Sequence, residues 1–165
     1  MSSTISRMLF TTDLSVNSTY ALHQAIGLAR ATEARMHILH VAEPMSEDAR
    51  ITLRLFIQDE KARESALQTR KQAIEQELAD RQERFWSALP EDSQSIRQQV
   101  DEVEVVEGHP AEVILRRAKE LDSDLIVLGA HSHGFSQTFL GSTAKRVLRR
   151  ATIPTLVVPY RSDRD

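Results

Sequence analysis

The chain has 165 residues, of which 41% are hydrophobic and 27% are charged, and its net charge at neutral pH is −3. This length suits one domain with one buried core, predicted over 1–165, and the lack of a basic excess argues against a protein that coats nucleic acid. The chain has no cysteine, which excludes disulfide scaffolds, zinc ribbons and thiol catalysis. No apolar run approaches the roughly 20 residues that cross a bilayer, and the first residues show no signal-peptide pattern. We therefore expect a cytoplasmic protein without membrane insertion.

Strand and helix patterns alternate from the start of the chain. Short apolar segments at 7–12 and 36–41 predict two β-strands. Between them, alanine and leucine recur at helical spacing over 21–29. Residues 13–18 are rich in side chains that cap helices, so the first helix is expected to begin directly after the first strand.

The segment from 47 to 89 differs from the rest because it contains neither glycine nor proline. Its apolar residues form a single helical stripe. The members of this stripe are Leu67, Ile74, Leu78, Phe85 and Leu89. One interpretation is a long amphipathic helix with a solvated charged face, and the other is a helix that docks a protein partner. Its more apolar start, 50–57, is interpreted as a separate short helix or a lid.

The second half of the chain returns to alternating strands and helices. Strands are predicted at 103–106, 125–128 and 155–158, and helices at 110–121 and 142–151. The complete order, β-α-β-α-β-α-β-α-β, predicts an α/β fold: a three-layer, Rossmann-like open sheet of five mostly parallel strands with helices on both faces. The last strand is a candidate for an unprotected sheet edge that a second copy of the chain would cover.

Unusual residues follow the strands, where ligands bind to sheets of this kind. Asp13 ends the first strand, and the segment 129–143 after the fourth strand holds three of the five glycines. Glycine lets backbone N–H groups approach an anion closely, and Ser142 and Thr143 would begin a helix whose N-terminus attracts phosphate. A phosphate cradle and an ordinary loop with a serine cap both remain open on these residues alone.

The same loop argues against one class of nucleotide site. The spacing Gly129-x4-Gly134 matches a Walker A motif, but Phe135 stands where the phosphate-binding lysine is required. A P-loop ATPase is therefore not indicated. His131 and His133 are candidates for a phosphate or ribose contact, for a pair of metal ligands, or for solvated loop residues.

Several segments together resemble the universal stress protein family. They are 8–15, 106–114, 124–129, 141–142 and 153–159, and the likeness covers nearly the whole chain, with 47–89 the least similar stretch. The resemblance implies a fold like that of the adenine nucleotide alpha hydrolases and a homodimer, here through Thr155, Leu156, Val157 and Val158. It also implies a stress-response regulator that binds ATP or AMP, with or without Mg, and hydrolyses ATP slowly at most. The alternative is a nucleotide-free dimeric module that docks protein partners through 47–89.

The resemblance also implies a nucleotide site at the carboxyl ends of the strands. Asp13 matches the aspartate that contacts the ribose, and Val41 matches the residue whose backbone meets the adenine. The full set of implied site residues is Thr11, Thr12, Asp13, Val41, Gly129, His131, Ser132, His133, Gly134, Gly141, Ser142 and Thr143. The family's glycine signature is spaced Gly-x2-Gly-x9-Gly, whereas the gaps here are x4 and x6, so the path of the phosphate loop is expected to differ.

Overall fold

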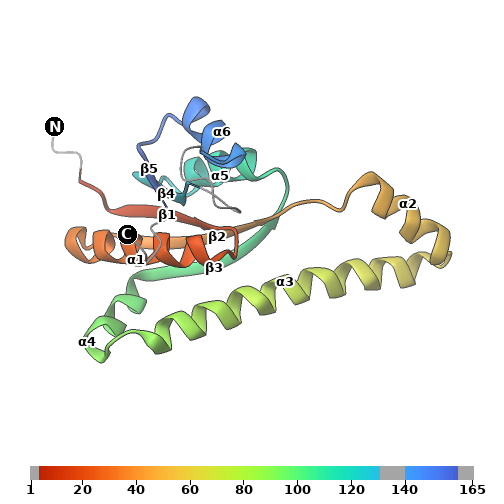
Figure 1. The fold of residues 1–165 in the computed structure, drawn as a ribbon, viewed down its shortest axis with the longest axis horizontal. Coiled ribbons are helices and arrows are strands. Elements are labelled where there is room, and N and C mark those ends of the chain that lie inside the picture. Colours follow the sequence, from red (N-terminus) through yellow and green to blue (C-terminus); the bar gives the residue numbers. More distant parts are fainter. Residues whose placement is uncertain (1–3, 131–139, 160–165) are drawn as a thin grey trace.

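The computed structural model describes residues 4–130 and 140–159 (Figure 1). Within these ranges five strands form one sheet, in the order β3-β2-β1-β4-β5, and every pair of neighbours is parallel. The strands are β1 (Arg7–Thr12), β2 (Arg35–Ala42), β3 (Val100–Glu107), β4 (Leu125–Gly129) and β5 (Thr155–Val158). The α/β class and the five parallel strands predicted from the sequence are confirmed.

Helices cover both faces of the sheet and give it three layers. The helix α1 (Val16–Thr32) packs on one face, while α5 (Pro110–Glu120) and α6 (Ser142–Arg150) pack on the other. Successive residues of a strand point to opposite faces, so β1 contributes to both cores. Met8 and Phe10 join the core beneath α1, and Leu9 joins the core beneath α5 and α6.

The segment 47–89 forms two helices, α2 (Glu47–Phe56) and α3 (Glu60–Ala88). The helix α2 and the first half of α3 reach away from the sheet (Figure 1). All residues of both helices are described, and the buried ones begin at Leu78. We call residues 47–77 the arm. The apolar stripe predicted over α3 is therefore buried only in its second half, and Leu67 is 45% exposed.

Two short helices follow α3 and were not predicted. They are α4 (Glu91–Gln94) and a 3-10 helix, η1 (Ser95–Gln99), which leads into β3. The helix α3 stops at Ala88, two residues before Pro90. None of the helices in the described ranges is long and apolar enough to cross a membrane.

The turn between β3 and α5 depends on glycine. Gly108 has a φ of 155°, and its N–H donates a hydrogen bond to the carbonyl of Ala42 at 3.0 Å. A Cβ on Gly108 would lie 2.6 Å from Cγ2 of the buried Val113, which is too close for any side chain. Pro110 takes the first position of α5, as predicted, because no N–H is needed there. The turn thereby places the start of α5 beside the end of β2.

A partly buried cluster of three polar side chains joins β2, β3 and α5. Oε1 of Glu104 on β3 lies 2.8 Å from Nε2 of His37 on β2 and 2.8 Å from Nε of Arg117 on α5. Burial acts to raise the pKa of the Glu104 carboxyl, but the hydrogen bonds from Arg117 and His37 outweigh it, and this pKa lies below its ordinary value. The charged form of Glu104 therefore stabilises the fold.

Substitution of Glu104 by glutamine should lower the free energy of unfolding by about 1 kcal/mol at neutral pH, a figure kept small because solvent reaches part of the carboxylate. The stability due to a lowered pKa is fully present above the ordinary glutamate pKa of about 4.3 and is lost as the pH falls through the lowered folded value. Urea unfolding should therefore show a lower free energy of unfolding for E104Q than for wild type near neutral pH. This difference should disappear in acid. The exposed Glu102 of the same strand gives the matched control, E102Q, for which no such difference is expected.

Candidate functional site

A cavity of about 460 Å³ lies at the carboxyl ends of β1, β2 and β4. The first crossovers from β1 run towards β3, while β4 and β5 lie on the other side of β1, so the strand order reverses between β1 and β4. Open parallel sheets bind ligands at this reversal, and the volume falls within the range typical of small-molecule sites.

Eight of the residues implied by the resemblance line this cavity. They are Thr11, Thr12, Asp13, Val41, Gly129, Gly141, Ser142 and Thr143. They come from four segments that are far apart in the sequence, and the parallel sheet brings them together because its strands all end at the same edge. The other four, His131, Ser132, His133 and Gly134, lie outside the described residues.

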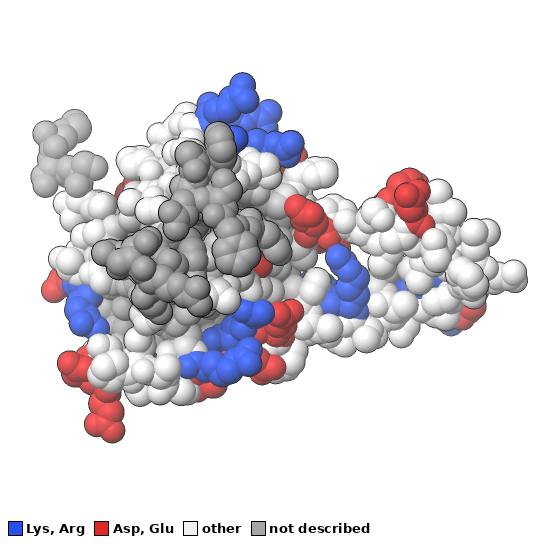
Figure 2. Space-filling model, in the orientation of Figure 1, with Lys and Arg blue, Asp and Glu red and all other residues white. Residues whose placement is uncertain are grey.

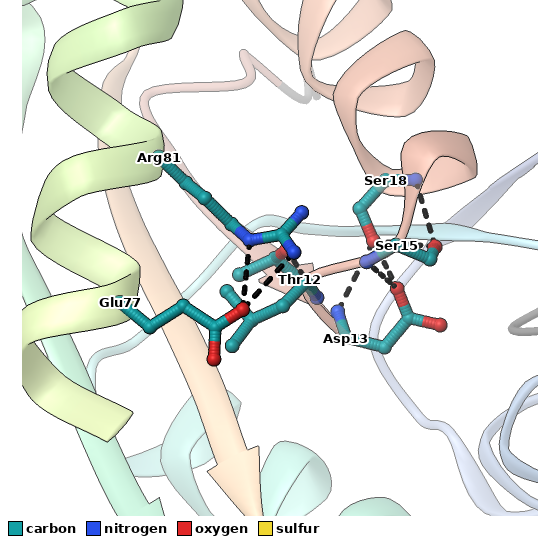
Figure 3. Close-up of polar contacts among 7 residues, drawn as sticks. Thr12, Asp13, Ser15, Ser18, Glu77 and Arg81 are labelled. Carbon is teal, nitrogen blue, oxygen red and sulfur yellow. Dashed lines mark hydrogen bonds and ion pairs between the residues drawn. The ribbon is translucent and has the colours of Figure 1, made fainter. Parts of the chain in front are cut away.

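The turn after β1 holds Asp13 in a fixed orientation (Figure 3). Oδ1 of Asp13 accepts hydrogen bonds from the backbone N–H of Ser15, at 2.9 Å, and from the hydroxyl of Ser18. The same Ser18 hydroxyl accepts the N–H of Asp13 at 3.1 Å. Leu14 takes a left-handed φ of 64°, and its N–H donates to Oγ1 of Thr12. The chain thus turns sharply and leaves an exposed carboxylate at the cavity.

Ser15 also begins α1, which explains why this turn can be so tight. Its side chain accepts the backbone N–H of Ser18 at 3.2 Å, the usual N-cap arrangement. The predicted run of capping residues at 13–18 therefore has two roles. It starts the first helix, and it fixes the carboxylate that the resemblance assigns to the ribose.

His40 connects the ends of β1 and β2 beneath the cavity. Its Nδ1 lies 2.8 Å from the carbonyl oxygen of Thr12, and because a carbonyl only accepts, Nδ1 carries the proton. The side chain is half-buried and hydrogen-bonded. It also lines the cavity, which the sequence did not indicate.

The N-terminus of α6 opens into the opposite side of the cavity. Gly141 is the N-cap residue and has no side chain to accept the first N–H groups of the helix, and no acidic residue occurs in the first turn. These N–H groups, at Ser142 to Ala144, carry the positive end of the helix dipole. The N–H of Gly141 donates to the carbonyl of Ala130 at 2.7 Å, so α6 begins directly beside the end of β4. This arrangement suits an anion.

Eleven further residues line the cavity that the resemblance did not imply. They are Ser18, His40, Ala42, Glu43, Arg70, Ile74, Pro110, Ile114, Leu128, Ala130 and Ala144. Glu43 could have been identified from its position directly after β2, because Asp13 directly follows β1 in the same way. Arg70 and Ile74 carried no such signal, because they belong to α3, and helical spacing does not say what a helix will face.

The cavity combines groups suited to three parts of a polar ligand. Helix N–H groups of α6 lie at one end of the cavity. A carboxylate and hydroxyl groups lie at the end of β1, and the apolar side chains of Val41 and Ile74 lie on the β2 side. Within the described residues, no three histidine, aspartate or glutamate side chains come together in a way that could hold a metal ion. The fold defines a doubly wound α/β protein with a cavity at the reversal of its strand order.

Comparison with known proteins identifies the family. A model of the universal stress protein family matches residues 4–159. The universal stress protein YxiE of Bacillus subtilis is 29% identical over 156 residues, which cover 92% of this chain and 97% of YxiE. The chain belongs to the universal stress protein family. A shorter match, 41% identical over 56 residues, covers 33% of this chain and only 20% of the universal stress protein Slr1230 of Synechocystis.

Solved structures share the fold. The protein MJ0577 superposes with a TM-score of 0.70 at 21% identity, over 97% of this chain and 99% of that one. A universal stress protein solved in complex with cAMP superposes with a TM-score of 0.61 at 22% identity, over 94% and 98% of the two chains. The Rossmann-like class predicted from the sequence is confirmed by these neighbours.

Proposed function

We propose that this chain binds an adenine nucleotide, ATP or AMP, in the cavity at the strand ends and acts as a cytoplasmic stress-response regulator. The observation that carries the proposal is the meeting of Asp13, Val41 and the N-terminus of α6 around one cavity of about 460 Å³. These groups come from three separate segments, and each provides what one part of a nucleotide needs.

The residues present fit such a ligand. The N–H groups at the start of α6 would hold phosphate, since the helix dipole favours negative charge there. The carboxylate of Asp13 would accept hydrogen bonds from ribose hydroxyl groups, and the backbone of Val41 would meet the base. The relative that was solved with cAMP supports an adenine nucleotide as the ligand class. We propose a binding and signalling role with slow ATP hydrolysis at most, and with Mg optional.

The proposal is tested on the protein as isolated. Native and then denaturing mass spectrometry should reveal a co-purified adenine nucleotide, and the melting temperature should rise with millimolar ATP or AMP. At a concentration of 100 times Kd, a ligand adds about 2.7 kcal/mol to the free energy of unfolding, which is readily seen as a shift. If neither a bound nucleotide nor a shift is found with any adenine nucleotide, the proposal is wrong.

A second candidate function rests on the exposed apolar residues of α2. Leu55 is 71% exposed and Phe56 is 83% exposed, at the end of a helix that buries none of its ten residues. Such side chains favour docking of a protein partner by the arm. The double substitution L55S/F56S should abolish capture of that partner and leave the response to nucleotide unchanged. If the same partner is still captured, docking through α2 is wrong.

We also propose that two copies of the chain pair along β5. This strand lies at one edge of the sheet, and Leu156 within it is 38% exposed. An edge strand left open invites further pairing, and a two-fold partner would cover it. Light scattering on the purified protein should then give twice the mass of one chain, and the mass of a single chain would contradict the pairing.

A further inference from the structure

Two side chains of α3, which belongs to the crossover from β2 to β3, form part of the cavity. Arg70 and Ile74 lie one turn apart on α3 and both line the cavity, whose other walls are strand ends and the first turns of α1, α5 and α6. Residues four apart on a helix share one face. This face of α3 therefore closes the cavity on the side of β2.

Arg70 is held over the ends of β2 and β3. Its Nη2 donates a hydrogen bond to the carbonyl of Glu43 at 3.0 Å, and its Nη1 lies 3.7 Å from Oε2 of Glu107. Figure 2 shows acidic and basic side chains together where the arm meets the body of the molecule. The Arg70 side chain is 35% exposed, so it is partly shielded from water, and its guanidinium is restrained by Glu43 and Glu107.

The position of Arg70 assigns it to one end of the ligand. The N-terminus of α6 offers its N–H groups on the far side of β1, whereas Arg70 and Ile74 stand beside Val41 on the β2 side. Apolar side chains suit a planar base better than a phosphate. A guanidinium plane also stacks on the face of an aromatic ring.

We propose that Arg70 and Ile74 form the outer wall of the base subsite, with the guanidinium of Arg70 packed over the face of the base. This inference rests on the proposed function and adds to it that α3 contributes directly to nucleotide affinity. The arm, which buries no residue of its own, would then be restrained whenever a nucleotide is bound.

Calorimetric titration of ATP and AMP into wild-type protein and variants tests the assignment. R70A should raise the Kd for ATP and for AMP by the same factor, about tenfold. An equal factor is expected because the two ligands share the base but differ in phosphate number. I74A should raise both values about fivefold through lost apolar contact. R84A removes an exposed arginine of the same helix outside the cavity and should leave both values unchanged.

Each outcome discriminates between explanations. A much larger loss for ATP than for AMP in R70A would mean that Arg70 attracts phosphate, and it would overturn the base subsite. Unchanged Kd values in both R70A and I74A would overturn this inference while leaving the proposed function intact. If wild-type protein binds neither nucleotide, both proposals fail. Hydrogen exchange gives an independent readout: AMP should protect amides of residues 60–77 in wild type and less so in R70A.

Discussion

Replacing Asp13 with alanine should weaken the binding of ATP and AMP by about 10- to 100-fold, the usual effect of losing hydrogen bonds to a charged group. Combining it with Gly141→Val should remove detectable binding. Gly141 has φ −62° and ψ 162°, a region open to any residue, so valine can be accommodated without backbone strain. Its side chain would nevertheless stand at the first N–H groups of α6, where the phosphate is expected.

The Asp13 variants need a control for the turn itself. Oδ1 of Asp13 accepts from Ser15 and Ser18, so D13A also removes contacts that shape the turn after β1. D13N keeps an acceptor oxygen at the same place but removes the negative charge. Comparing it with D13A therefore separates the effect of the charge from the effect of the turn geometry. D92A removes an exposed aspartate of α4 and should bind as wild type does. Calorimetry that shows full affinity in both D13A and D13N would place the nucleotide elsewhere.

The sheet and its crossovers were predictable because each follows from local chemistry. Apolar runs between capping residues and turn glycines define strands and helices, and Gly108 followed by Pro110 marks a turn that glycine and proline favour. The convergence of Asp13, Val41 and Gly141 then followed from the parallel order, since strand ends share one edge. The four loop residues from His131 to Gly134 remain predictions of contact with the ligand.

The orientation of α3 could not be predicted. Helical periodicity places Leu67, Ile74 and Leu78 on one face of α3. It does not predict how much of that face the body of the protein covers. Burial of α3 depends on tertiary packing. This packing stops near Leu78 because the strands and α1 do not extend further along α3. For the same reason the contribution of Arg70 to the cavity had no signal in the sequence.

A matched pair of substitutions on α3 should show this difference directly. Leu78 is 2% exposed and Leu67 is 45% exposed, although they lie about three turns apart on the same stripe. L78A should lower the free energy of unfolding by about 2–5 kcal/mol through lost apolar contacts and a residual cavity. L67A should change it by about 0.5 kcal/mol or less, as expected for a surface position.

Urea unfolding of both variants makes the comparison quantitative. The residue type, the helix and the change in intrinsic helix propensity are the same in both substitutions, so these contributions cancel in the difference. What remains is the surroundings of each leucine: Leu78 is buried and lines a small cavity together with Phe10, Leu22 and Phe85, whereas Leu67 faces solvent. Equal losses would mean that the arm packs along its whole length. A large difference would show that the core holds α3 at Leu78 but not at Leu67, so that the cavity residues Arg70 and Ile74 lie on a part of the helix between these two positions.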